Sequence, residues 1–182
     1  MKSIIKKVVC LLVAIVLCDQ TVYAYSSVKA RVANKTITYK FGSFTEGIVN
    51  KWYLKYAWQN ALSDWPNAYS RITVVQSSST SNTLGMMSES SSYLYGSTEM
   101  DFYLTSGHIY YFFGKLNVGN PDITNTNVAR SAANHELGHL LGIADLNSGN
   151  AIMNVNRNRS SIYVPQTDDV NGVIATYTTW GN

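Results

Sequence analysis

Two histidines and a glutamate in the second half of the chain have the types and spacing of a metal-dependent hydrolase site. His135 and His139 are four residues apart, so on a helix their imidazoles lie on the same face and can bind one ion. Glu136 follows the first histidine and lies near the same opening, where a general base for a zinc-bound water is needed. The motif therefore predicts a zinc site with hydrolytic chemistry.

The residues after the second histidine extend this pattern. Gly142 can adopt the left-handed conformation that ends a helix and reverses the chain. Asp145, six residues beyond His139, can then reach the metal as a third ligand. Three protein ligands leave a fourth position for water, as a catalytic zinc site requires. Met153 follows eight residues after the aspartate and makes the pattern more specific.

Hydrophobic periodicity predicts the helices that position these residues. A helix over residues 128–141 carries both histidines and is capped by one of the asparagines at 125–127. The apolar residues of this helix do not extend over the face that carries the histidines. A bound metal would explain why that face is polar. A C-terminal helix begins at Thr167, where Asp168 and Asp169 lie at the positive end of the helix dipole. Its predicted buried stripe is Val170, Val173, Ile174 and Tyr177.

The first half of the chain predicts a strand followed by a helix. Residues 36–41 alternate apolar and polar side chains, as a half-buried strand does. Ser43 and Glu46 have the spacing of a capping box and predict a helix over residues 43–65. The predicted apolar stripe of that helix is Ile48, Val49, Trp52, Tyr56, Ala57 and Ala61.

Four further strands are predicted before the metal motif. Residues 71–76 and 84–87 form two of them, and residues 98–105 and 108–113 form an antiparallel hairpin around Ser106-Gly107. The predicted inward-facing residues of the hairpin are Met100, Phe102, Leu104, Ile109, Tyr111 and Phe113.

The first 24 residues have the composition of a secretory signal peptide. Lys2, Lys6 and Lys7 precede an apolar run over residues 8–17, and Ala24 supplies a small residue for cleavage. The run is about ten residues long, well short of the ~20 needed to cross a bilayer as a helix. We therefore expect residues 1–24 to be removed, residues 25–182 to form one catalytic domain, and no stable membrane anchor to remain.

Charge and cysteine content limit the partners of the remaining chain. Without the three lysines and one aspartate of the leader, 11 basic and 10 acidic residues remain. A nearly neutral surface gives no electrostatic basis for binding nucleic acid. Cys10 and Cys18 both lie in the leader, so we expect no disulfide and a monomer stabilised by its core, by zinc and, in addition, by any structural calcium that binds.

The motif and its flanks resemble the metzincin zinc metalloproteases. The run HELGHLLGIAD at 135–145, followed by AIMN at 151–154, is similar to the zinc helix and methionine turn of that family. The run DDVNGVIATY at 168–177 and ITYKF at 37–41 are most similar to the matrixins. The resemblance implies an α+β, zincin-like catalytic domain. It would have a twisted, mostly parallel sheet with an antiparallel edge strand, two long helices and a C-terminal helix after the methionine turn.

The resemblance also implies roles for individual residues. Met153 would lie beneath the zinc as a packing floor, and one of Asp168 and Asp169 would brace the methionine turn through backbone hydrogen bonds. An extended peptide substrate would pair with the edge strand, for which residues 98–105 are the candidate.

Asp145 departs from the commoner metzincin pattern, which has histidine as the third ligand, and resembles snapalysin-like proteases instead. His108 is the one other histidine of the chain, and we interpret it as a strand or turn residue, with a second metal site as the alternative. Tyr163 is ten residues past Met153, whereas metzincins with a tyrosine at the metal place it two past, so an additional role for it is disfavoured.

Together these features predict a secreted, extracellular zinc endopeptidase that acts on a protein or peptide substrate. His135, His139 and Asp145 would bind the metal, and Glu136 would act as the base. The alternatives are a catalytically silent zinc-containing adhesin or inhibitor, and a hydrolase of cell-wall peptides. The intact glutamate favours catalysis, because binding alone needs no base. Substrate preference is not predicted, since the pocket beside the metal would be walled by the loop over residues 154–165.

Overall fold

The computed structural model describes residues 28–46, 49–90 and 93–180, so the predicted leader lies outside the described residues. Five strands form one mixed sheet. They are β1 (Thr36–Phe41), β4 (Thr73–Gln76), β5 (Thr83–Met87), β6 (Gly96–Phe102) and β7 (Ile109–Asn117). Their order is β4-β1-β5-β7-β6, with parallel pairing except between β6 and β7. The antiparallel strand β6 is therefore an edge of the sheet.

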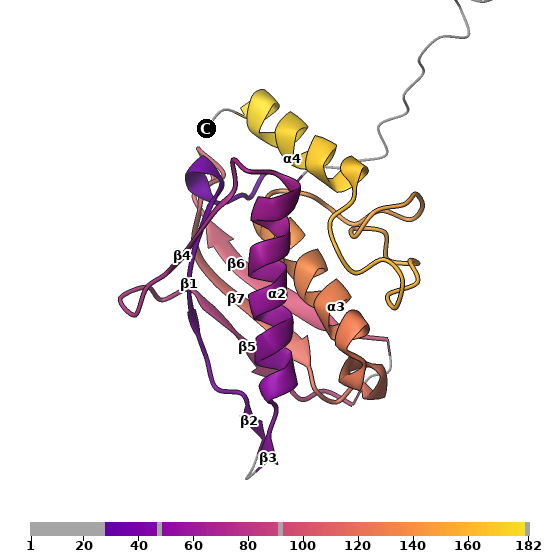
Figure 1. Cartoon of the computed structure of the whole chain (residues 1–182). Helices are drawn as coiled ribbons and strands as arrows, with labels where there is room; N and C mark the ends of the chain where they lie inside the picture. The colour runs from indigo at the N-terminus through magenta and orange to yellow at the C-terminus, as the bar shows by residue number, and fades with distance from the viewer. Residues whose placement is uncertain (1–27, 47–48, 91–92, 181–182) are drawn as a thin grey trace, which may run out of the picture.

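Helices cover one face of this sheet and one end of the molecule. They are α2 (Trp52–Ala68), α3 (Thr126–Leu140) and α4 (Thr167–Trp180), with short 3-10 segments η1 (Ala33–Lys35) and η2 (Pro121–Thr124). α2 and α3 lie side by side across the sheet, and α4 lies beyond their ends (Figure 1). Trp58 and Trp65 of α2 are fully buried and donate hydrogen bonds to the carbonyl oxygens of Gly85 (2.9 Å) and Asn134 (3.0 Å). These two side chains tie α2 to β5 and to α3 without leaving a polar tip unpaired.

The metal-motif helix predicted over residues 128–141 spans Thr126–Leu140, and its predicted asparagine cap and glycine ending are confirmed. The Asn125 side chain accepts from the backbone N–H groups of Asn127 (3.0 Å) and Val128 (3.4 Å), as an N-cap does. At the other end Gly142 has φ +88°, and the N–H of Ile143 donates to the carbonyl of Gly138 at 3.1 Å. This is the glycine-terminated ending that the sequence predicted, and it turns the chain back toward the site.

The predicted helix over residues 43–65 is wrong at its start. The Ser43 hydroxyl accepts from the N–H of Thr45 (3.3 Å) in a local turn, and the following residues form a short antiparallel pair, β2 (Thr45–Glu46) with β3 (Val49–Asn50). A serine that bonds its own backbone in a turn competes with its use as a helix cap. The helix begins at Trp52, which is 50% exposed, so the buried face differs from the predicted stripe. Leu54, Ala57, Trp58, Ala61, Leu62 and Trp65 are buried, Tyr56 is exposed, and Ile48 lies outside the described residues.

The β6–β7 hairpin is confirmed. In β6 the predicted inward residues Met100 and Phe102 are partly buried, whereas the neighbouring Glu99 and Asp101 are exposed, but the predicted inward face of β7 is wrong. β7 buries Phe112, Gly114 and Leu116 toward the helices, one residue out of step with the predicted set. Since successive strand residues face opposite sides, a shift of one residue exchanges the two faces. A Cβ at Gly114 would come within 3.1 Å of the Trp58 ring, so this buried position needs glycine and gives no apolar signal. Leu104 lies past the end of β6 and is 76% exposed.

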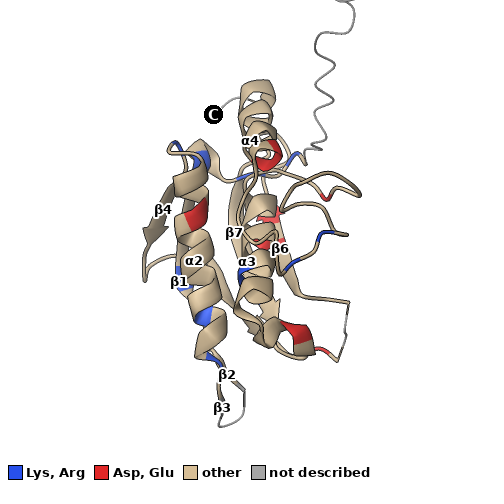
Figure 2. Cartoon of the chain, turned by 45° about the vertical axis from the view of Figure 1, so that its right-hand side comes forward, with Lys and Arg blue, Asp and Glu red and all other residues tan. Residues whose placement is uncertain are grey.

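The C-terminal helix starts at Thr167 as predicted. Val173 and Tyr177 are buried, whereas Ile174 is 40% exposed. The Tyr177 hydroxyl donates to the carbonyl of Val32 at 2.6 Å, which fastens α4 to the segment before β1. No helix among the described residues is both long enough and apolar enough to cross a membrane. In Figure 2 the basic and acidic residues are scattered along the backbone of several elements.

Candidate metal centre and active site

The end of α3 and the loop after it bring three metal-ligating side chains together. The ligand atoms of His135, His139 and Asp145 all lie within 4.8 Å of one another. Asp145 Oδ1 is 3.0 Å from His135 Nε2 and 3.6 Å from His139 Nε2. Within the described part of the chain, this is the one cluster of three such residues. The predicted ligand set is thus brought to one point.

Backbone carbonyl groups orient both imidazoles. His135 Nδ1 lies 3.0 Å from the carbonyl of Ile152, and His139 Nδ1 lies 3.0 Å from that of Ile143. An Nδ1–H that donates to these carbonyls leaves Nε2 free to bind a metal. Bonds of zinc length in a tetrahedral site place ligand atoms about 3.3 Å apart. Both distances to Asp145 lie close to that value, and two imidazoles with one carboxylate are ligand types that zinc prefers, so these residues are compatible with zinc.

The electrostatics suit Asp145 as a ligand. The pKa of its carboxyl lies below the ordinary value, chiefly because its Oδ1 lies within hydrogen-bond distance of His135 Nε2, and partial burial opposes this decrease. The carboxylate is therefore ionised at neutral pH, which is the form that binds a metal. Its side chain is 57% exposed, so the ligand cluster opens to solvent.

The turn that contains Met153 packs directly beneath α3. Met153 is fully buried, and a Cβ at Gly138 would come within 2.3 Å of its sulfur, so only glycine permits this contact. The buried carboxylate of Asp169 accepts hydrogen bonds from the N–H groups of Ile152 (2.7 Å), Met153 (3.1 Å) and Gln166 (2.8 Å). Burial raises the pKa of Asp169, and these backbone bonds oppose the rise. The three amides bond to Asp169 and not to Asp168.

Glu136 lies beside the ligands and is held by β6. It is 6% exposed, and its Oε2 accepts a hydrogen bond from the Thr98 hydroxyl at 2.8 Å. A Cβ at Gly96 would come within 3.0 Å of Glu136 Cγ and Oε1, so the glycine makes room for the carboxylate. The contacts of Thr98 and Gly96 with Glu136 were not predicted, because no local pattern in the sequence marks a contact between a distant strand and α3.

Arg157 is a second site residue that the sequence did not mark. Its guanidinium is 5% exposed and donates to the Ser131 hydroxyl (2.9 Å), the Ser131 carbonyl (3.0 Å) and the Asn154 carbonyl (3.0 Å). Its Nη1 also lies 3.3 Å from His135 Nδ1. Burial lowers the pKa of Arg157 to about 9, and the nearby charge of Arg159 adds to the effect. Arg157 thus locks the loop after Met153 against α3.

A groove of about 370 Å³ runs over these residues. Glu136 and the three metal-ligating side chains lie along it, and Gly96, Ser97 and Thr98 of the edge strand β6 form its border. Of the predicted substrate-pairing segment 98–105, only Thr98 lines the groove, and the bordering part of the edge strand begins before that segment.

Two other residues considered from the sequence lie apart from the cluster. His108 forms an isolated bridge with Arg31, and the described residues contain no second cluster of three metal-ligating groups beside it. The carbonyl of Tyr163 accepts from Asn134 at 2.9 Å, and its ring lies against Arg130, 5.2 Å from the guanidinium carbon. Neither residue belongs to the metal cluster.

Comparison with known proteins gives little beyond the fold. No family model matches the chain, and no curated protein matches it. Among solved structures, the chain is similar to one in the GM1 bound form of the ECX AB5 holotoxin, with a TM-score of 0.54 and 17% sequence identity. The match covers 84% of this chain and 84% of that chain. At this identity the likeness concerns the fold alone.

The predicted metzincin fold class is corrected by this comparison. The solved chain that shares the architecture belongs to an AB5 holotoxin, and nothing in its description points to a metzincin. The physical reason is that a short motif determines only local structure. Residues 135–145 determine the geometry of one helix end and one turn, and the same site chemistry recurs on unrelated folds. We therefore describe the fold by its observed strands and helices.

Proposed function

We propose that this protein is a zinc-dependent endopeptidase that hydrolyses peptide bonds. The observation that carries the proposal is the buried Glu136 carboxylate beside three convergent metal-ligating side chains in one open groove. Zinc bound there would polarise a substrate carbonyl and acidify a water molecule. The similarity of residues 135–145 to the metzincin zinc motif is a second support, and it concerns the site and not the fold.

Glu136 is placed to move the protons of this reaction. Its carboxylate takes a proton from the water whose oxygen bonds to the carbonyl carbon, and returns it to the nitrogen when the C–N bond breaks. The Thr98 hydroxyl binds Oε2, so the carboxylate is held in one orientation while Oε1 serves the transfer. The oriented imidazoles of His135 and His139 and the carboxylate of Asp145 would hold the metal.

The free edge of β6 offers a binding mode for the substrate. An extended peptide can add to a sheet edge through main-chain hydrogen bonds, with its side chains in alternating pockets. Because β6 borders the groove, such a peptide would pass over Glu136 and the metal ligands. Secretion is part of the proposal and rests on the composition of residues 1–24.

Casein digestion by the wild-type protein and the variant Glu136→Gln tests the function. We expect cleavage that a chelator abolishes and zinc restores, and a loss of about a hundredfold or more in the variant. Zinc content should stay the same, since Glu136 is not a ligand. Glu89→Gln, at an exposed position outside the groove, is the matched control and should keep full activity.

If neither the wild-type protein nor Glu136→Gln cleaves casein, with or without a chelator, the proposal is contradicted. That result would favour a zinc-containing binding protein. Cleavage of cell-wall peptides with no cleavage of casein would instead assign the same site to that narrower substrate class.

A further inference from the structure

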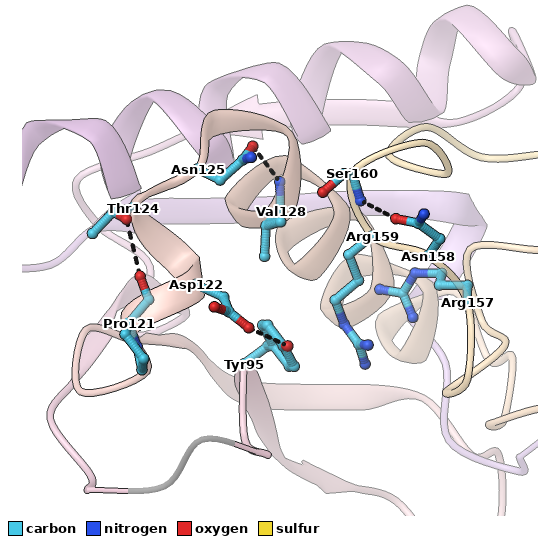
Figure 3. Close-up of a pocket in the computed structure, with 10 residues that line it drawn as sticks. All are labelled: Tyr95, Pro121, Asp122, Thr124, Asn125, Val128, Arg157, Asn158, Arg159 and Ser160. Carbon is cyan, nitrogen blue, oxygen red and sulfur yellow. Dashed lines mark hydrogen bonds between the residues drawn. The ribbon is translucent and has the colours of Figure 1, made fainter.

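A second pocket opens beside the metal groove. It has a volume of about 480 Å³ and lies between the start of α3, η2 and the loop after Met153 (Figure 3). Tyr95, Arg157 and Arg159 line both this pocket and the groove, so the two spaces adjoin each other. We call it the arginine pocket. A substrate residue next to the scissile bond would direct its side chain into it.

The guanidinium of Arg159 lines this pocket, and some of its N–H donors form no hydrogen bond with the described residues. Its Nη2 donates to the carbonyl of Val155 at 3.2 Å, and its guanidinium lies over the Tyr95 ring, 4.1 Å from the centroid. Its Nε is buried and has no hydrogen-bond partner among the described residues. A guanidinium has five N–H donors, so Arg159 keeps donors that a ligand can use. Burial lowers the pKa of Arg159, as expected for a charge with weak compensation.

Arg157 adds positive charge but few free donors. Its guanidinium bonds to Ser131 and to the carbonyl of Asn154, which fixes it in the wall between the pocket and the groove. It therefore contributes to the positive potential of the pocket, and Arg159 is the residue available for direct contact.

One acidic residue, Asp122, also lines the arginine pocket. Its carboxylate accepts a hydrogen bond from the Tyr95 hydroxyl at 3.0 Å. Figure 3 shows Tyr95 between Asp122 and Arg159, in agreement with its contacts to both. The pocket is thus lined by two arginines and one aspartate, and the aspartate is already engaged. Its positive charge exceeds its negative charge.

We propose that the arginine pocket selects substrates with aspartate or glutamate next to the scissile bond. This rests on the proposed endopeptidase function. A carboxylate that enters the pocket can form charge-assisted hydrogen bonds with Arg159, and the planar guanidinium favours a paired geometry. Val128 of α3 supplies an apolar surface for the methylene groups of such a side chain.

Mass spectrometry of the cleavage sites in a peptide library tests the preference. We expect the wild-type protein to show enrichment of aspartate and glutamate at one position beside the cleaved bond. In matched peptides that differ only by glutamate or glutamine at that position, kcat/KM should favour glutamate by about tenfold or more. The ratio should fall as salt is added, because screening weakens a partly exposed ion pair.

Three variants assign the preference to the pocket. Arg159→Gln should lower the glutamate-to-glutamine ratio to about one, with folding checked by circular dichroism and zinc content. Asp122→Asn removes the opposing charge and should raise the ratio, which gives a second test should Arg159→Gln fold poorly. Arg71→Gln removes an exposed positive charge outside the pocket and should leave the ratio unchanged.

The outcomes separate this inference from the proposed function. Cleavage by the wild-type protein without acidic preference, or a preference that survives in Arg159→Gln, overturns the inference and leaves the endopeptidase intact. A wild-type protein that cleaves no peptide in the library overturns both.

Discussion

At the scale of single residues, the proposed metal ligands and the proposed base could be predicted from the sequence more readily than the residues that contact them. His135, Glu136 and His139 share one helical turn, so their spacing in the sequence determines their relative positions. Asp145 follows through a glycine-ended helix, whose geometry is also local. Thr98 reaches Glu136 from 38 positions away in the chain, and no periodicity connects them. The relative positions of these four residues were thus predictable, and the contact from Thr98 was not.

The hydrogen bond from Thr98 to Glu136 gives a prediction at this scale. Thr98→Val keeps the shape of the side chain but removes the hydroxyl that donates to Oε2 at 2.8 Å. A hydrogen bond to a charged group contributes about 1.5–3 kcal/mol, so kcat should fall about tenfold or more. Steady-state kinetics on a fluorogenic peptide measure this, with Thr98→Ser, which keeps the hydroxyl, as the control. Equal kcat for the valine and serine variants would show that the bond does not serve catalysis.

At the scale of elements, local competition and packing explain where the predictions were wrong. Ser43 had the sequence of a helix cap, but its hydroxyl bonds to a nearby amide and the helix starts at Trp52. Gly114 lies in the middle of the buried face of β7. Because glycine has no side chain, the pattern of hydrophobic residues does not reveal that this position is buried. Elements were thus predicted well where an apolar face and an end signal agreed, as in α3, and poorly where a glycine or a turn intervened.

The link between α4 and the Met153 turn gives an element-scale prediction. Asp169 accepts three backbone N–H groups, and asparagine would place an NH₂ group against at least one of them. Asp169→Asn should therefore lower the free energy of unfolding by about 1–3 kcal/mol and weaken zinc binding about ten- to a hundredfold. Chemical denaturation and competition with a chromogenic chelator measure the two effects.

Asp168→Asn is the matched control, because Asp168 lies one residue away at the same helix start. Removal of the Asp168 charge should lower the free energy of unfolding only by the helix-dipole contribution, about 0.3–1 kcal/mol. Zinc affinity should change little. Equal effects from the two substitutions would mean that the hydrogen bonds to the turn do not support the metal centre.

At the scale of the whole molecule, a short motif determined a site but not a fold class. The candidate centre draws on α3, the loop to Asp145, the Met153 turn and the edge strand β6, and α4 braces it through Asp169. The sequence identified the first three because they are continuous in the chain. The order of strands in the sheet depends on contacts between distant segments, and the likeness to an AB5 holotoxin chain at 17% identity could not be foreseen from any run of residues.

This convergence of elements predicts that zinc stabilises the whole domain. Zinc that binds His135, His139 and Asp145 in the native state alone would add to the core packing and to the hydrogen bonds of Asp169 that already join these segments. Free zinc at about a thousand times its dissociation constant would add ~4 kcal/mol, which in a chain of this size raises Tm by about 8–16 °C. Scanning calorimetry of the protein with zinc and after chelation measures the shift. His135→Ala should lose the zinc dependence, because removal of one imidazole leaves the ion two ligands. If the wild-type protein has the same Tm with and without zinc, then zinc does not stabilise the folded state. That result would contradict the assignment of these three residues as zinc ligands.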